Sequence, residues 1–282
     1  MLAHLAGCND EPGKEHSLIF GDPKKVEVTG YSGHMMEPFL SPDGGILFFN
    51  NLNAPPENTN LHWSTQIDDN SFKYEGEVDG VNTADLEGVA TMDQNKQFYF
   101  VSTRNYDQTL STVYTGLFAN GMVTGVLLVP NISLNTNGWL NFDVEVDFTG
   151  NYLYLVDGRF DQNGGPYEAD LFLAEKTSTG FTRSTSDPFV NVNTPQLEYA
   201  ACISRDNLEL YFTRLETPIS SSSQPKIYGT YRASLADDFL PPVKIDAATG
   251  FVEGPTLSLD GNTLYFHKAE NGKFVLYTIR KL

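Results

Sequence analysis

Five acidic residues recur along the chain, each directly after an apolar residue. In three of the five copies a threonine stands four positions before the acidic residue. Ionised carboxylates accept hydrogen bonds from hydroxyl groups and bind cations, and two of them together can act as general acid and base. The acidic residues are Glu37, Glu87, Asp143, Glu198 and Glu253, and the three threonines are Thr83, Thr194 and Thr249.

After the second strand of each repeat, a polar or basic residue recurs. Two interpretations of these acidic and basic residues stay open. In the first, each carboxylate pairs with a nearby cation or backbone N–H group and holds neighbouring repeats in register. In the second, carboxylates, guanidinium groups and aromatic rings line a pocket for a hydroxyl-rich ligand. The recurring polar or basic residues are Asn51, Arg104, Arg159, Arg214 and Lys268. The pocket would consist of Glu37, Glu87, Arg104, Trp139, Asp143, Arg159, Glu198, Tyr199, Arg214, Glu253 and Lys268.

Repeated β-hairpins are the elements that must position these residues. Each copy has a short strand, a turn containing Asp or Gly, and an aromatic-aliphatic strand, which is a hairpin signature. A threonine closes each of the first four units at a spacing of roughly 40 to 55 residues, which is typical of propeller blades. The hairpins span residues 37–49, 87–101, 143–156, 202–212 and 255–266, and the closing residues are Thr83, Thr136, Thr194 and Thr249.

Between each hairpin and its threonine lie two further candidate strands, for example residues 170–174 and 189–192 in the third unit. Four strands in each of five units predict an all-β fold, a five-bladed β-propeller of four-stranded antiparallel blades. No segment has a sustained helical period, so essentially no helix is expected. The expected blades are residues 31–83, 84–136, 137–194, 195–249 and 250–282, the last completed by 18–30.

The N-terminal segment is expected to close the ring. The fifth unit ends after its third strand, residues 274–279, and the run from Lys24 to Tyr31 parallels the run from Lys244 to Phe251. Residues 18–30 therefore supply the missing strand of a single domain that covers 18–282. A closed ring protects strand edges that would otherwise pair with other chains.

The hairpin copies also carry a family resemblance. Residues 41–49 read SPDGGILFF and residues 258–266 read SLDGNTLYF, and both resemble the PD40 (TolB-like, WD40-like) propeller repeat. The two middle copies depart from it, with Met92-Asp93-Gln94 and Phe148-Thr149-Gly150 at the turn. The resemblance implies a propeller and leaves the chemistry open, because propellers host many functions.

A second resemblance concerns catalysis. Glu253-Gly254-Pro255 resembles the Glu-Gly-Pro around the general acid of five-bladed furanosidase-type glycosidases, although there it lies in a middle blade. The resemblance implies Glu253 as acid and Glu37 or Asp143 as base, since hydrolysis needs two carboxyl groups at a defined separation. We expect instead non-catalytic recognition of a glycan or a protein segment at the channel mouth. The glycosidase and a purely structural interaction module are the alternatives.

Composition restricts the partners. The 282 residues are 40% hydrophobic with 24 Gly and 15 Pro, which excludes a disordered or collagen-like chain. The formal net charge is −18, so the protein repels phosphate backbones and anionic lipid headgroups. Nucleic acid is therefore not an expected partner, and a monomer is expected.

The N-terminus indicates a compartment. Leu5-Ala6-Gly7-Cys8 resembles a bacterial lipobox, and residues 9–16 are polar like a tether. The resemblance implies lipidation at Cys8 and a lipoprotein of the bacterial cell envelope that contacts the membrane only through its anchor, with residues 1–17 outside the propeller. A cytoplasmic protein is the alternative, because only seven residues precede Cys8.

Metal and cofactor signals are weak. The five histidines lack metal-ligand spacing, so no metal and no cofactor are expected. One turn, Asp161 to Gly165, resembles a calcium-binding turn without the full set of oxygen ligands, so a structural calcium ion stays open. Cys202 sits in an apolar strand and is expected to be a buried thiol.

Overall fold

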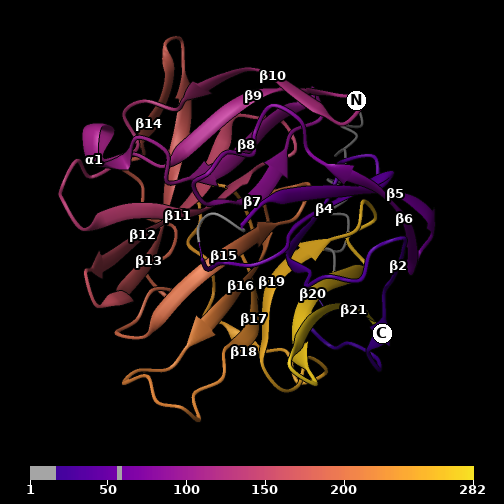
Figure 1. Ribbon diagram of the computed structural model, residues 1–282. Helices are drawn as coiled ribbons and strands as arrows, with labels where there is room; N and C mark the ends of the chain where they lie inside the picture. Colours follow the sequence, from indigo (N-terminus) through magenta and orange to yellow (C-terminus); the bar gives the residue numbers. More distant parts are fainter. Residues whose placement is uncertain (1–16, 56–58) are drawn as a thin grey trace, which may run out of the picture.

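A computed structural model describes residues 17–55 and 59–282, and its strands are arranged around a central axis (Figure 1). The fold is the expected five-bladed β-propeller, with one short helix, α1 (Tyr106–Thr109). Cys8 and the rest of residues 1–16 lie outside the described residues. No helix in the described ranges is long and apolar enough to cross a membrane.

The blades follow one another along the chain. In each, the first strand is innermost and the next strands run antiparallel towards the outside. Blade 1 contains β3 (Met36–Leu40), β4 (Ile46–Asn50), β5 (Leu61–Asp68) and β6 (Ser71–Glu77). Blade 2 contains β7 (Glu87–Met92), β8 (Gln97–Ser102), β9 (Val113–Ala119) and β10 (Met122–Leu128). Blade 3 contains β11 (Trp139–Val146), β12 (Tyr152–Asp161), β13 (Gly164–Thr177) and β14 (Gly180–Arg183).

Blades 4 and 5 complete the circle. Blade 4 contains β15 (Leu197–Ile203), β16 (Glu209–Leu215), β17 (Lys226–Tyr231) and β18 (Val243–Lys244). Blade 5 contains β19 (Val252–Leu257), β20 (Thr263–Glu270), β21 (Lys273–Arg280) and β1 (Lys24–Lys25). One parallel bridge, Ala169 to Leu197, joins the neighbouring sheets of blades 3 and 4.

The N-terminal strand closes the ring, as the sequence predicts. Lys24 pairs with Thr278 and Lys25 with Tyr277, both antiparallel. The chain then passes from blade 5 to blade 1. There β2 (Glu27–Thr29) pairs in parallel with β6 and becomes the fifth strand of the blade 1 sheet. The two strands therefore connect the last blade to the first on both sides of the junction.

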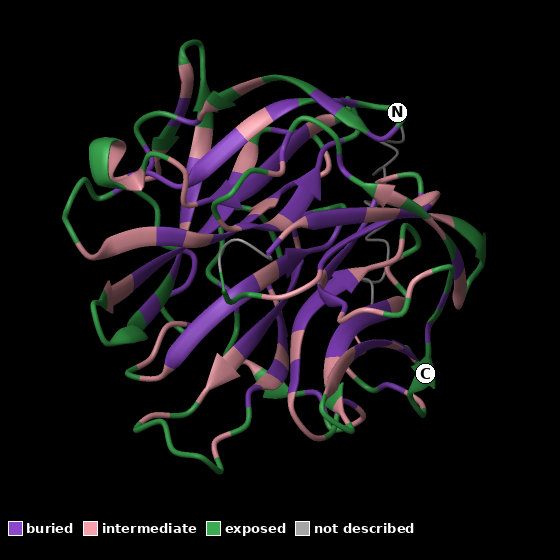
Figure 2. Ribbon diagram, in the orientation of Figure 1, coloured by how far each residue is buried: buried purple, intermediate pink, exposed green. Residues whose placement is uncertain are grey.

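Five hydrophobic clusters hold the propeller together, one in each space between adjacent blades. The cluster between blades 1 and 2 packs Phe48 against Phe98 and Phe118, and the cluster between blades 5 and 1 packs Phe72 against Tyr265. The other three clusters fill the junctions 2–3, 3–4 and 4–5. Figure 2 shows the resulting pattern, with buried inner strands and exposed outer loops. The inner strands are buried on both faces and have continuous runs of buried residues, whereas outer strands such as β6 and β9 alternate between buried and exposed positions.

The repeated turns gather at one end of the propeller, here called the hairpin end. In blade 1 the Ser41 hydroxyl donates to Asp43, at 2.6 Å, and accepts the backbone N–H of Ile46, at 2.9 Å. The serines of blades 4 and 5, Ser204 and Ser258, make the same pair of bonds. In blades 2 and 3 an aspartate replaces the serine and accepts the backbone bond itself, which explains why these copies depart from the repeat.

One predicted strand is wrong. Residues 189–192 form a turn, in which the N–H of Val192 donates to the carbonyl of Phe189, and the outermost strand of blade 3 is β14 instead. Phe189 and Val192 are both fully buried between blades 3 and 4. Their apolar character thus reflects packing of the turn and not strand pairing.

Candidate functional site

Every innermost strand contains a β-bulge at the end of the channel opposite the hairpins, here called the bulge end. The register with the second strand shifts after Met36 in β3, Gly88 in β7, Asn141 in β11, Tyr199 in β15 and Glu253 in β19. In four blades the first bulge residue has a positive φ: 47° at Glu37, 54° at Val89, 52° at Ala200 and 63° at Gly254. Bulges re-aim side chains, and they occur often beside active sites.

The bulges divide the five acidic residues into two classes. Glu87 and Glu198 lie two residues before the bulge, whereas Glu253 lies one residue before it. Glu37 is itself a bulge residue, and Asp143 follows the register shift of β11 directly. The shared Thr-x-x-x-Glu spacing therefore does not make Glu253 structurally equivalent to the other two glutamates.

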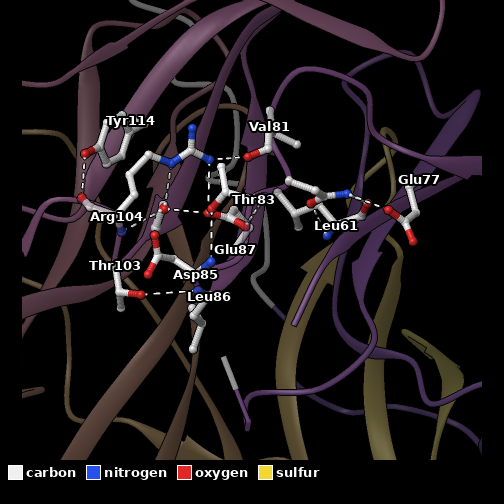
Figure 3. A network of polar contacts seen from close by, with 12 residues as sticks. Leu61, Glu77, Val81, Thr83, Asp85, Leu86, Glu87, Thr103, Arg104 and Tyr114 are labelled. Atoms are coloured by element: carbon white, nitrogen blue, oxygen red, sulfur yellow. Dashed lines mark hydrogen bonds and ion pairs between the residues drawn. The ribbon is translucent and has the colours of Figure 1, made fainter. Parts of the chain in front are cut away.

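Glu87 belongs to a structural network in blade 2 (Figure 3). Its fully buried carboxylate accepts hydrogen bonds from the backbone N–H and the hydroxyl of Thr83, both at 2.8 Å, and from Ser102 at 2.7 Å. The Arg104 guanidinium donates to it at 3.0 Å and also to the carbonyl of Val81. The same guanidinium lies over the Tyr114 ring, 5.1 Å from its centroid. Every charge in this network has a partner.

Blade 4 repeats the network. Glu198 is fully buried and accepts the N–H and hydroxyl of Thr194, at 3.0 and 2.7 Å, and the Arg214 guanidinium, at 2.5 Å. Arg214 also donates to the carbonyl of Val192 and lies over the Tyr228 ring. The first interpretation of the acidic residues, in which each carboxylate pairs with a nearby cation and backbone N–H group, therefore describes blades 2 and 4. We call these paired residues the ladder.

A sequence signal for the ladder was missed. The tripeptide Val-Asn-Thr precedes both buried glutamates, at residues 81–83 and 192–194. The Asn82 side chain bonds both backbone groups of Leu61, and the Asn193 side chain does the same with Leu171. Blade 5 has Ala-Ala-Thr at residues 247–249 and lacks this asparagine. The sequence alone therefore distinguishes Glu253 from the two buried glutamates.

The other three acidic residues meet at the channel axis, in what we call the carboxylate cluster: Glu37, Asp143 and Glu253. Glu253 accepts the hydroxyl of Tyr199 at one oxygen and a bond from His267 Nε2, at 3.0 Å, at the other. The backbone N–H of Glu37 donates to His267 Nδ1, at 3.0 Å. Because Nδ1 accepts, the neutral imidazole carries its proton on Nε2 and donates it to Glu253.

Glu37 and Asp143 complete the cluster with few donors. Asn53 donates to Glu37 Oε1 at 3.0 Å. Asp143 is 3% exposed, and its Oδ1 has no hydrogen-bond partner among the described residues. Burial raises the pKa of Asp143 well above its usual range, and the charges of Glu37 and Glu253 raise it further. Burial also raises the pKa of Glu37. No Lys or Arg of residues 17–55 or 59–282 forms an ion pair with these three carboxylates.

The space beside the cluster is small. Glu37 and Asp143 border a cavity of about 30 Å³ on the axis, which is lined by residues at and beside the bulges of all five blades. This volume holds about two water molecules. A hydroxyl or amino group can reach the carboxylates, but a sugar ring cannot pass between them.

Three predicted site residues stay apart from the cluster. Arg159 pairs with Glu168, at 2.5 Å, on the outside of blade 3. Trp139 is half-buried at the start of β11, where its carbonyl accepts the Tyr106 hydroxyl at 3.0 Å. The Lys268 ammonium lies over the Tyr277 ring, 5.3 Å from its centroid.

The described residues offer no group of three or more His, Cys, Asp or Glu side chains that could hold a metal ion. In the turn that resembles a calcium site, Asp161 accepts the N–H of Asn163 at 2.7 Å and the Tyr167 hydroxyl at 3.1 Å. Its carboxylate is thus used within the turn. Cys202 is a buried free thiol, as the sequence predicts.

Comparison with known proteins supports the fold alone. No family model matches the chain, and no curated protein matches it. An endo-arabinase from Bacteroides thetaiotaomicron is 12% identical, with a TM-score of 0.57 over 92% of this chain and 96% of that chain. A family 117 glycoside hydrolase from Zobellia galactanivorans is 10% identical, with a TM-score of 0.54 over 93% and 90%.

TolB from Acinetobacter baumannii is 14% identical over 86% of this chain, with a TM-score of 0.47. The chain spans about half of the length of that protein, 53%. Glycoside hydrolases and TolB proteins thus both appear among the similar structures, and at these identities the two glycoside hydrolases share an architecture with this chain.

Proposed function

We propose that the protein is a non-catalytic glycan-binding propeller whose site is the carboxylate cluster at the bulge end. The observation that carries this proposal is the convergence of Glu37, Asp143 and Glu253 from three blades, with no lysine or arginine paired to them in the described part of the chain. In blades 2 and 4 an arginine forms an ion pair with the buried glutamate. The described residues form no such pair with the three carboxylates on the axis.

A glycan hydroxyl supplies what the cluster lacks. Like charges held together under partial burial raise the free energy of the folded state, and such arrangements concentrate at functional sites. The unpartnered Asp143 Oδ1 and the half-buried Glu37 present acceptors to the channel. A sugar hydroxyl that enters the cavity of about 30 Å³ can donate to them, while the sugar ring remains at the mouth.

Two features support binding without hydrolysis. Both oxygens of Glu253 already accept bonds from Tyr199 and His267, so its carboxylate is held away from a leaving group. The cavity is also too small for an anomeric carbon to lie between two carboxyl groups together with its ring.

A glycan array followed by calorimetry tests the proposal. Wild type should bind a glycan, and Glu37→Gln and Asp143→Asn should each weaken binding about tenfold, which corresponds to about one lost hydrogen bond. The control is Glu168→Gln, which removes the same charge from the outside of blade 3 and should bind like wild type. Wild type that binds no glycan, or cluster variants that bind normally, would reject the proposal and favour a structural interaction module.

One observation favours a second candidate, a glycoside hydrolase. The raised pKa of Asp143 favours the protonated form of that carboxyl group beside two other carboxyl groups, which is the form that a general acid needs. In this candidate Asp143 takes the acid role that the Glu-Gly-Pro resemblance gives to Glu253. Turnover of an array glycan that is lost in Asp143→Asn would support the enzyme.

We also propose that the protein is an envelope lipoprotein anchored at Cys8. Leu5-Ala6-Gly7-Cys8 supports the anchor. Labelled palmitate should enter the wild-type chain expressed in a bacterial host and should be absent from Cys8→Ser. Equal labelling of both chains, or of neither, would contradict the anchor.

A further inference from the structure

A second cavity lies at the hairpin end, away from the carboxylate cluster. It has a volume of about 630 Å³, within the range of small-molecule sites, and all five blades contribute to its wall. Much of the wall is apolar, formed by side chains that include Phe39, Met92, Val146, Ile203 and Leu257. We call it the hairpin cavity.

Glu145 lies at the inner end of the hairpin cavity, because it borders both this cavity and the small cavity on the axis. The Thr91 hydroxyl donates to Glu145 Oε2 at 2.7 Å and fixes the side chain. Burial raises the pKa of Glu145 to about 8, with a smaller contribution from the charge of Asp147. The buried Cys202 thiol also faces Glu145. With its pKa of about 8, the Glu145 carboxyl group is uncharged in most molecules at pH 7.

The charges around the mouth favour a cation. Asp206 and Asp260 stand on two of the turns that form the wall, and both are exposed. Asp260 forms an ion pair with Arg280 at 3.8 Å, in which both side chains are exposed to water. Lys281 is neutralised by its contact with Glu209, and the Arg205 guanidinium stacks on the Phe148 ring at 4.0 Å, on an exposed turn. The deeper part of the cavity therefore combines apolar walls with Glu145, while the second buried acidic residue of the wall, Glu209, is paired with Lys281.

We propose that the hairpin cavity is a second binding site, which takes a primary amine on an aliphatic stem with its ammonium group against Glu145. The apolar walls contact the stem, as they do when lysine methylenes are buried. The ammonium ion then pairs with the Glu145 carboxylate, which releases its proton to solvent on binding. This site does not depend on the glycan proposal, because it uses the other end of the channel and none of the cluster residues.

Calorimetry at pH 7 in two buffers of different ionisation enthalpy tests the site. Pentylamine should bind at least ten times more tightly than pentanol, and its binding should release close to one proton. Glu145→Gln should weaken pentylamine at least tenfold and abolish proton release. Glu216→Gln, which removes an exposed carboxylate outside the cavity, should behave like wild type.

The source of the amine is distinguished by a second ligand, N-acetyl-lysine methylamide. Tighter binding than pentylamine assigns the site to a lysine side chain of a protein, and weaker binding assigns it to a free amine. Binding of pentylamine to wild type without proton release would overturn the proposal whether or not the variant folds. Equal affinity for pentanol, or an unchanged affinity in a folded Glu145→Gln, would also overturn it.

Discussion

Blades 2 and 4 use their acidic residue in a different way from blades 1, 3 and 5. In the first pair a buried glutamate two residues before the bulge meets an arginine at the end of the second strand or just after it, and a threonine from the preceding loop. In the other three, a carboxylate at or next to the bulge meets further carboxylates. A shift of one or two residues relative to the bulge therefore separates a structural ion pair from a member of the carboxylate cluster.

The comparison also teaches why a repeat alone cannot assign function. The same residue type on the same strand stabilises one blade and destabilises another, depending on whether a cation and donors are within reach. The three carboxylates of the cluster accept bonds from His267, Tyr199, Asn53, Asn50 and the backbone of Ala200, none of which is an arginine or a lysine. Each ladder glutamate has an arginine and at least two further donors.

Removal of a ladder glutamate should give the largest loss of stability. Glu198→Ala leaves Arg214 without its ion pair in a site where the guanidinium side chain is 14% exposed, so we expect the free energy of unfolding to fall by about 3 kcal/mol. Urea unfolding measures the change. In the double variant Glu198→Met with Arg214→Met most of the loss should return, since no charge is then left unpaired. A loss below about 1 kcal/mol for the single variant would mean that the ladder is not structural.

The bulge of blade 5 should be the next most sensitive position. An added Cβ at Gly254 would lie 3.0 Å from Glu37 Cα and 3.2 Å from His267 Nδ1, in a backbone with φ of 63°. Gly125 has a similar φ of 65° and nothing within 4 Å, so Gly125→Ala is the matched control for the backbone alone. We expect Gly254→Ala to cost about 1–2 kcal/mol more than Gly125→Ala. Equal losses would show that the bulges of blades 5 and 1 are not packed together.

The architecture was predictable from the sequence because its signals are local. Each hairpin has its own turn residues and strand pattern, so Ser41, Ser204 and Ser258 with their aspartates mark three turns without any long-range information. The closing strand was predictable for the same reason. Residues 189–192 were not, because burial of Phe189 and Val192 in a turn gives the same apolar pattern as a short strand.

The candidate site was predictable only in part. The three cluster carboxylates were among the eleven candidates, but so were Glu87, Glu198 and their arginines, because spacing along the chain does not specify a bulge. A bulge inserts one residue and changes the direction of everything after it. The hairpin cavity had no signal in the sequence, since strand ends and turns from all five blades form its wall.

Replacement of Asp143 should stabilise the protein by a smaller amount that depends on pH. The unfolded chain releases this proton at about pH 4, whereas the folded chain retains it to higher pH. Wild type therefore loses stability as the pH rises from the unfolded pKa towards the folded pKa, and Asp143→Asn should not. Thermal unfolding from pH 5 to pH 8 should show a growing advantage for the variant, about 1 kcal/mol or more at pH 8.

Replacement of an exposed aspartate, Asp161, is the control for the Asp143 measurements, because the change in stability should have the opposite sign. Backbone and side-chain hydrogen bonds lower the pKa of Asp161, so its contribution to stability is present above the unfolded pKa and is lost as the pH falls. Asp161→Asn should therefore lose stability at neutral pH. If Asp143→Asn and Asp161→Asn changed in the same direction, burial would not be the cause of the difference between them.

The smallest effect is expected for the arginine of blade 3 that occupies the ladder position in the sequence. Arg159 pairs with Glu168 at 2.5 Å, but the two side chains are 41% and 54% exposed, so water competes for both charges. Exposed ion pairs contribute about 0–1 kcal/mol, and we expect Arg159→Ala to lower the free energy of unfolding by less than about 0.5 kcal/mol. Arg214→Ala, the equivalent change in blade 4, should cost about 3 kcal/mol by leaving Glu198 buried and unpaired. Urea unfolding of the two variants side by side measures the contrast, and similar losses would place Arg159 in the ladder after all.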